Sequence, residues 1–333
     1  HIQHGRLIDP ANGTDERLDL YISHGGIAAV GQKPRGFEAD RIIDASNHIV
    51  CPGLVDLGVH LRESGDEHKA SICSETAAAA KGGITTLICT PDTNPVMDTP
   101  AAWELLRRRA KQCGKAHVLA MGALTRDLQG EQLAEMAALN KAGCVAVSNG
   151  DYPLANTLVA LRAMEYAATF DLPVVLRSED HALKANGCVH EGPVSARLGL
   201  PGIPAAADTV AVARDLALAE HSGARIHFHC PSTAGAAKLV RAARGQNAPV
   251  SAGVAIHQLF LLESDVDDFT ISCHVDPPFR SLADREALRN AVADATFGAI
   301  CSDHQPHDPN LNKLPFPQTA PGISGLETLL PLT

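Results

Sequence analysis

Long apolar runs are missing from this sequence, and none approaches the ~20 residues that a helix needs to cross a bilayer. An excess of positive charge is missing as well. The chain has 28 basic and 38 acidic residues, which gives it a net charge of -10. This balance argues against nucleic acid or an anionic membrane surface as the main partner. We therefore expect a cytoplasmic protein that binds neither nucleic acid nor membrane.

Closely spaced cysteine pairs are also missing. The nine Cys are scattered along the chain, and no C-x-x-C motif occurs. In an intracellular chain of this size, such a pattern favours reduced thiols buried in the core.

The first 50 residues differ in pattern from the rest of the chain. They hold short apolar segments separated by turn-forming pairs such as Asp-Pro, Asn-Gly and Gly-Gly, which are typical of hairpins. These segments are Ile2 to Ile8, Leu18 to Ile22, Gly26 to Val30 and Arg41 to Ile43. We predict that residues 1–49 form the N-terminal part of a small β domain. The chain stops in an apolar segment at Leu332-Thr333, so we expect a barrel at 50–333 that is truncated at its C-terminus.

From residue 50 onward, apolar strands alternate with Ala-rich helical segments. The predicted strands are Val50–Leu57, Thr85–Cys89, Ala116–Ala120, Cys144–Val147, Val174–Leu176, Arg225–His229, Val250–Gly253 and Ala299–Cys301. Predicted helices between them include Ser74–Lys81, Ala101–Gln112 and Leu158–Ala168. Eight strands with helical crossovers favour a parallel (β/α)8 barrel over an open sheet. Polar clusters at the strand ends support the barrel, because barrel active sites lie there.

Those polar clusters also carry a family resemblance that runs nearly from end to end. They are Ile49-Val50-Cys51-Pro52-Gly53-Leu54-Val55-Asp56, His60-Leu61-Arg62-Glu63-Ser64-Gly65, Thr90-Pro91-Asp92-Thr93-Asn94-Pro95, Ser302-Asp303-His304-Gln305-Pro306-His307 and Gly325-Leu326-Glu327-Thr328. In this order they resemble dihydroorotase of the amidohydrolase superfamily. The resemblance implies a distorted (β/α)8 barrel with a small β-sandwich built from both chain ends. We expect much of the second half of that sandwich to be absent here.

The resemblance implies a zinc-activated water that adds to a ring amide carbonyl, with a strand-8 aspartate as proton shuttle. At the end of the first barrel strand the family has His-x-His, whose two imidazoles share one face because side chains at i and i+2 do. Here the first position is Gly58, which has no side chain, and the second is retained as His60. The strand-8 carboxylate is retained as Asp303.

The remaining metal positions are changed. The strand-4 ligand falls on Asn149 or Gly150, although Asp151 would reach the site if the loop shifts. At strand 5 the family's His becomes Arg177, whose guanidinium keeps its proton and would repel a cation. At strand 6 the family's His aligns with Cys230, which could bind zinc as a thiolate, although such a cysteine is more often a small buried hydrophobic residue. A register shift of one would bring His229 there instead. We predict that the metal centre is lost.

The positions that hold the substrate in the family are changed as well. Arg62, which would clamp a carboxylate, and His307 are retained. Two asparagines of the family become Asp92 and Asp276, which place negative charge where an anionic substrate would bind.

The leading hypothesis is a non-catalytic dihydroorotase-like protein of pyrimidine biosynthesis. The resemblance implies a structural role, in which copies of this chain scaffold the catalytic trimers of aspartate transcarbamoylase within a larger complex. We expect no cofactor in that case. One alternative is a residual dihydroorotase with one zinc ion on His60, Cys230 or His229, and Asp303. Another is a small-molecule sensor that grips a carboxylate with Arg62.

Overall fold

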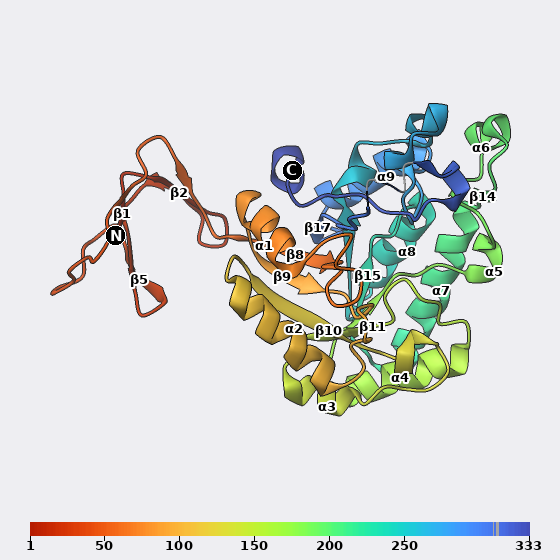
Figure 1. The fold of residues 1–333 in the computed structure, drawn as a ribbon, viewed down its shortest axis with the longest axis horizontal. Coiled ribbons are helices and arrows are strands. Elements are labelled where there is room, and N and C mark those ends of the chain that lie inside the picture. Colours follow the sequence, from red (N-terminus) through yellow and green to blue (C-terminus); the bar gives the residue numbers. More distant parts are fainter. Residues whose placement is uncertain (309, 311–312) are drawn as a thin grey trace. The chain divides into compact units, whose positions relative to one another are not determined.

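The structure is a computed structural model that describes residues 1–308, 310 and 313–333. The chain divides into two compact units, His1–Leu54 and Val55–Thr333 (Figure 1).

The smaller unit consists of short strands: β1 (Ile2–Gln3), β2 (Arg6–Asp9), β3 (Thr14–Arg17), β4 (Leu20–Ser23), β5 (Gly26–Val30), β6 (Ile43–Asp44) and β7 (Ile49–Val50). They form one sheet in the order β5-β4-β1-β6 and another in the order β3-β2-β7. The antiparallel strands β4 and β5 are joined at His24 and Gly25, whose φ angles of 52° and 77° are both left-handed. Positive φ at two successive positions is what a tight hairpin with right-handed twist requires.

The larger unit holds the predicted parallel barrel. Its strands are β8 (Leu54–Val59), β9 (Ile84–Cys89), β10 (His117–Ala123), β11 (Ala146–Ser148), β12 (Val174–Leu176), β15 (Ile226–His229), β16 (Val250–Ala255) and β17 (Ala299–Cys301). They lie side by side in the order β17-β16-β15-β12-β11-β10-β9-β8. A parallel bridge between Val59 and His304 joins the first strand to the segment after the last, so the barrel is nearly closed.

All eight predicted barrel strands are confirmed; Val174–Leu176 and Ala299–Cys301 have the predicted bounds, and the other six have shifted ones. The first begins at Leu54 rather than Val50. Pro52 explains the shift, because proline has no backbone N–H to donate to a neighbouring strand.

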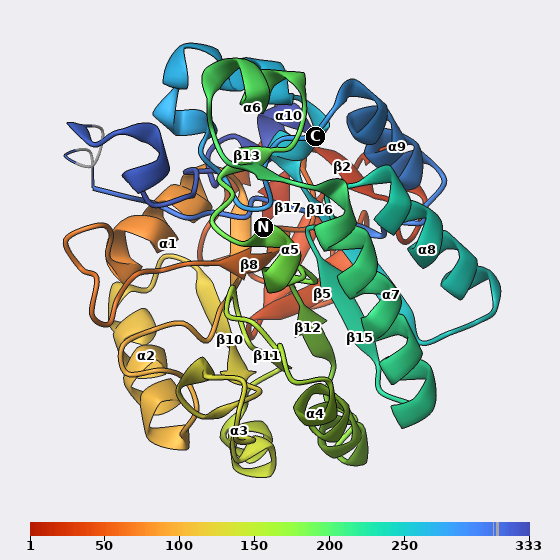
Figure 2. The same cartoon turned by 90° about the vertical axis from the view of Figure 1, so that its right-hand side faces the viewer.

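Helices surround the barrel strands, as Figure 2 shows. They are α1 (Ile72–Lys81), α2 (Pro100–Cys113), α3 (Met136–Ala142), α4 (Thr157–Thr169), α5 (His181–Lys184), α6 (Pro193–Leu198), α7 (Ala205–Ser222), α8 (Ala234–Gly245), α9 (Leu282–Ala293) and α10 (Leu329–Leu332). Several begin at side-chain caps, such as Ser71 before α1 and Thr233 before α8, whose hydroxyls accept a backbone N–H of the first turn. Between α5 and α7 lie the short paired strands β13 (Val189–His190) and β14 (Gly202–Ile203), and several 3-10 turns follow β16, including η2 (Ile256–Leu259).

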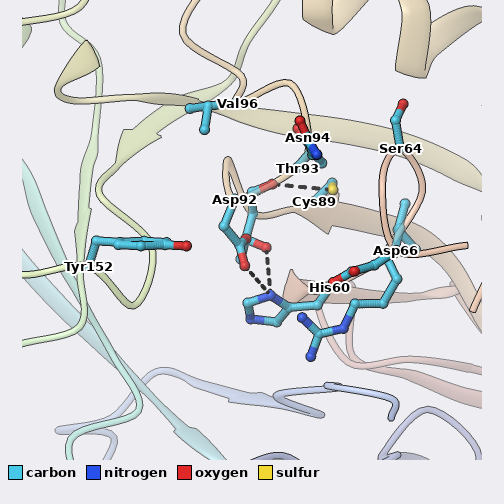
Figure 3. A pocket seen from close by; sticks show the side chains of 12 residues that line it. His60, Ser64, Asp66, Cys89, Asp92, Thr93, Asn94, Val96 and Tyr152 are labelled. Atoms are coloured by element: carbon cyan, nitrogen blue, oxygen red, sulfur yellow. Dashed lines mark hydrogen bonds and ion pairs between the residues drawn. The ribbon is translucent and has the colours of Figure 1, made fainter. Parts of the chain in front are cut away.

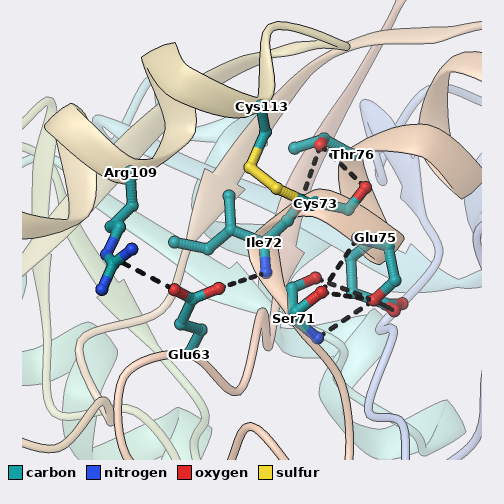
Figure 4. The surroundings of a disulfide bond; sticks show 9 residues. Glu63, Ser71, Ile72, Cys73, Glu75, Thr76, Arg109 and Cys113 are labelled. Carbon is teal, nitrogen blue, oxygen red and sulfur yellow. Dashed lines mark hydrogen bonds and ion pairs between the residues drawn. A yellow bond between two sulfur atoms is a disulfide. The ribbon is translucent and has the colours of Figure 1, made fainter.

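One prediction about cysteine was wrong. Cys73 of α1 and Cys113 of α2 form a disulfide, which Figure 4 shows between the two helices. These residues lie on helical surfaces that pack together, a proximity that their separation of 40 residues does not reveal. Six of the other seven thiols are buried, as expected, and Cys51 is exposed.

The barrel strands carry small and branched apolar side chains that are fully buried. Val59, Leu87, Ala120, Val147 and Val174 have no exposed surface, and each comes from a different strand. This close packing of the strands fixes their ends, and with them the polar side chains of the mouth. Within the described part of the chain, no helix combines the length and apolar character that crossing a membrane requires.

Candidate functional site

The polar residues singled out in the sequence meet at the carboxyl end of the barrel. Each follows a different strand: His60 follows β8, Asp92 β9, Asp151 β11, Arg177 β12, Cys230 β15 and Asp303 β17. Because parallel strands end at the same rim, residues far apart in the chain become neighbours there.

Arg177 lies at the centre of this cluster, and its side chain is 6% exposed. Its Nε lies 2.7 Å from a carboxylate oxygen of Asp151, and its Nη2 donates to Asp303 at 2.5 Å. Its Nη1 donates to the backbone carbonyl of Asp276. Burial alone would lower the pKa of Arg177, but the two carboxylates outweigh it and hold that pKa well above its usual value. The guanidinium is therefore a permanent cation between two acids.

The same contact fixes the charge of Asp303. Burial would raise the pKa of this carboxyl, whereas Arg177 and the imidazole of His229 lower it far below its usual range. His229 contributes through its Nε2, which lies 3.4 Å from the carboxylate. Asp303 is consequently held as an anion already paired with a cation.

His60 lies close to two carboxylates beside the cluster of Arg177, and Figure 3 shows the one that belongs to Asp92. Its Nδ1 lies 2.8 Å from Asp92, and its Nε2 lies 3.7 Å from Asp151. Burial opposes the charged imidazole, but the two carboxylates prevail and raise the pKa of His60. His60 in turn lowers the pKa of Asp92 against the effect of burial.

At Gly58 the position of the missing imidazole is filled by another residue. A Cβ built on Gly58 would lie 2.4 Å from Cε1 of His229, which is closer than real side-chain contacts allow. The ring of His229 therefore lies where a side chain at Gly58 would have to begin. The absence of a side chain at Gly58 therefore makes room for the ring of His229.

Cys230 lies beside a partner that the sequence did not indicate. Its Sγ is 3.4 Å from Sγ of Cys301, which belongs to β17, and both residues are buried. Burial raises the pKa of the Cys230 thiol well above its ordinary value. The Cys230 thiol is therefore neutral, and it packs beside Cys301 in the apolar wall of the barrel.

Asn149 does not point to the centre of the cluster. Its amide oxygen accepts from Thr125 at 2.6 Å, and its amide nitrogen donates to the carbonyls of Leu128 and Tyr152. The neighbouring Asp151 reaches Arg177 instead, which is the arrangement that the sequence left open. Gly150 permits it, because its φ of 59° is left-handed and turns the loop between the two residues.

A cavity of about 350 Å³ opens beside His60, and Arg62, Asp92, Asn94 and Tyr152 are among the residues that line it (Figure 3). Arg62 donates through Nε to the carbonyl of Pro306 at 3.1 Å, which directs its guanidinium along the cavity wall. Two of the predicted substrate residues, Arg62 and Asp92, therefore share one cavity.

The other two predicted substrate residues have different neighbours. Asp276 forms an ion pair with Lys184, which also binds Glu179 at 2.5 Å. Burial, reinforced by Asp276, raises the pKa of Glu179 to about 7. His307 faces Pro321, whose carbonyl is 2.8 Å from its Nε2, and burial lowers its pKa to about 4. Lys184 gave no signal in the sequence, since an isolated lysine on a four-residue helix has no distinguishing pattern.

Two groups in the described part of the chain bring possible metal donors within 4.8 Å of one another: His60, Asp92 and Asp151, and His229, Cys230 and Cys301. The zinc centre implied by the resemblance does not fit these residues. Arg177 contacts Asp151 and Asp303, the acids such a centre would use, and a second cation there would face its charge directly. The ligand set predicted for one zinc ion, His60 with Cys230 or His229 and Asp303, is not among these groups, so the alternative of one ion falls on His60, Asp92 and Asp151 instead.

The fold and its polar mouth define a parallel α/β barrel of the amidohydrolase type. A family model described as Dihydro-orotase-like matches residues 47–234. The chain belongs to this dihydroorotase-like family.

Relatives agree with this assignment, and a solved structure agrees with the fold. A "Dihydroorotase-like protein" of Pseudomonas aeruginosa is 49% identical over 331 residues, which cover 99% of this chain and 78% of the relative. A "Dihydroorotase" of Syntrophotalea carbinolica is 44% identical and covers 100% of this chain and 78% of the relative. The L-hydantoinase of Arthrobacter aurescens superposes with a TM-score of 0.86, covering 99% of this chain and 75% of that enzyme. At 23% identity, this last similarity shows the fold alone.

Proposed function

We propose that this chain is a catalytically inactive member of the dihydroorotase-like family with a structural role in pyrimidine biosynthesis. The observation that carries the proposal is the guanidinium of Arg177, which ion-pairs with both Asp151 and Asp303. Arginine cannot give up its proton at physiological pH and so cannot act as a ligand or a base. A fixed organic cation stands where hydrolysis would require a metal-activated water.

The protonation state of Asp303 supports the same proposal. A proton shuttle must accept and release a proton near neutral pH. Arg177 and His229 lower the pKa of Asp303 far below that range, so the carboxylate stays charged. The acid that would move protons in an active relative is committed to an ion pair here.

The proposed partner is the catalytic subunit of aspartate transcarbamoylase. This part rests on the family resemblance: copies of this chain would bridge catalytic trimers into a larger assembly. A stable interface of this kind buries more than about 1,200 Å². The test is size-exclusion chromatography with light scattering on the co-expressed pair. We expect one large complex, and separate elution together with full transcarbamoylase activity in its absence would overturn the scaffold role.

A second candidate function is residual hydrolysis of a cyclic amide with one zinc ion. The observation that favours it is the group of His60, Asp92 and Asp151, since three protein ligands are typical of a catalytic zinc. Elemental analysis after dialysis against zinc distinguishes the two candidates when it is repeated with Asp92→Asn. One tightly held zinc in the wild type that this variant loses would favour the residual hydrolase.

A further inference from the structure

Positive charge is concentrated in one short stretch of this acidic chain. Between residues 107 and 117 lie Arg107, Arg108, Arg109, Lys111, Lys115 and His117, on the second half of α2, the loop to β10 and the first residue of β10. Arg107 is neutralised by Glu104 at 2.6 Å, and Arg109 lies 3.7 Å from Glu63. Arg108, Lys111 and Lys115 are exposed and form no ion pair with a carboxylate in the described ranges. We call these three residues the cationic surface.

A hollow of about 550 Å³ adjoins the cationic surface. Lys111, Lys115 and His117 line its polar side, and Ala110, Val118 and Leu119 are among its apolar residues. A hollow lined by both cationic and apolar side chains suits a protein segment in which acidic side chains flank an apolar one. A nucleic acid or an anionic membrane would extend beyond the surface and meet the acidic remainder of a chain with a net charge of -10.

The surface is held in a fixed shape. Cys113, the last residue of α2, is bonded to Cys73 of α1 (Figure 4). Gly114 then ends the helix in the left-handed conformation, with φ 61°, which glycine adopts without strain. A surface that is already ordered loses little entropy when a partner binds.

The hollow lies at the amino ends of the barrel strands. Thr85 and His117, which line it, stand at the beginning of β9 and β10. The candidate site lies at the carboxyl ends of the same strands. A partner bound at the hollow would therefore leave the mouth of the barrel uncovered.

We infer that the cationic surface and its hollow bind an acidic segment of the protein partner. This inference rests on the proposed function, since it assigns the contact with the transcarbamoylase subunit to one face of the barrel. The interaction is electrostatic at its rim, so the rate of association should fall as salt is added.

The test measures the affinity of the complex for two double variants with the same change in charge. Lys111→Glu with Lys115→Glu reverses the charge of the cationic surface. Lys33→Glu with Lys238→Glu reverses the charge of two exposed lysines elsewhere. We expect the first double variant to bind at least about tenfold more weakly and no longer to be weakened by salt, because like charges would then face each other and salt would screen their repulsion. We expect the control to bind as the wild type does. Lys111→Gln with Lys115→Gln serves the same purpose if the reversed variant does not fold.

The experiment separates a failure of the surface inference from a failure of the scaffold proposal. If the wild type forms a complex and both double variants bind equally well, the surface inference is wrong and the scaffold proposal stands. If the wild type forms no complex with the transcarbamoylase, both are wrong.

Discussion

At the scale of single residues, the candidate site differs from the family pattern at Gly58 and Arg177, and neighbouring side chains match both changes. Gly58 leaves room for the ring of His229, and that ring in turn contacts Asp303. Arg177 compensates the charge of the same Asp303. Neither position is simply a ligand removed from an otherwise unchanged site, because neighbouring groups occupy the space and balance the charge.

The packing at Gly58 can be tested with a double-mutant cycle. Gly58→Ala should lower the free energy of unfolding by about 1–3 kcal/mol, because the new methyl group overlaps the ring of His229. In the double variant with His229→Ala, this cost should largely disappear, since the methyl group then has space. Urea denaturation of the four proteins measures the coupling. Strictly additive effects would show that the two positions do not compete for space.

The ion pairs of Arg177 make a second prediction. Arg177→Met removes the cation and leaves the buried carboxylate of Asp303 without its partner, so the free energy of unfolding should fall by about 3–5 kcal/mol. Arg241→Met is the matched control, because Arg241 and Asp294 form an exposed pair at 2.7 Å that solvent screens and that adds little to stability. Urea denaturation compares the two. Equal, small losses would contradict the central position given to Arg177.

At the scale of secondary-structure elements, two features affect the stability of the larger unit: a disulfide makes it depend on redox conditions, and a buried histidine makes it depend on pH. The disulfide joins α1 to α2, and Glu63 links the same helices by accepting the backbone N–H of Ile72 and facing Arg109 (Figure 4). His257, at the start of η2 after β16, is buried in the interior.

Removing the disulfide should destabilise the larger unit measurably. The bond closes a loop of 40 residues, so Cys73→Ser should lower the free energy of unfolding by about 2–4 kcal/mol under oxidising conditions. With reductant present, wild type and variant should unfold together. Cys51→Ser, at an exposed free thiol, is the control and should change little. A wild type whose unfolding is unaffected by reductant would contradict this prediction.

His257 makes the barrel sensitive to acid. Burial lowers its pKa to about 4, below the unfolded value of about 6.5. The neutral form is favoured in the folded state, so its contribution is complete above about pH 6.5 and is lost as the pH falls toward 4. His257→Gln should make the decline shallower by up to about 1.4 kcal/mol per pH unit. The exposed His221→Gln should follow the wild type; if His257→Gln does so too, His257 is not the group that titrates.

At the scale of the whole molecule, the sequence predicted the repeating features and missed the particular contacts. The strand–helix alternation gave the barrel, because a packed parallel barrel requires apolar strands at regular spacing. The motifs also identified Arg177 and Asp303, which lie side by side in the structure. The disulfide, the pairing of Cys230 with Cys301 and the use of Asp151 in place of Asn149 depend on side-chain directions that no pattern in one sequence encodes. Net charge likewise concealed the local concentration of cations on α2.

The most direct test of the central claim is the interconversion of dihydroorotate and carbamoyl-aspartate by the purified chain with zinc added. Because Arg177 ties Asp303 into an ion pair, we predict a rate no greater than background, unchanged by zinc and the same in wild type and Asp303→Asn. A zinc-dependent rate in the wild type that Asp303→Asn abolishes would contradict the claim and make this chain an active hydrolase.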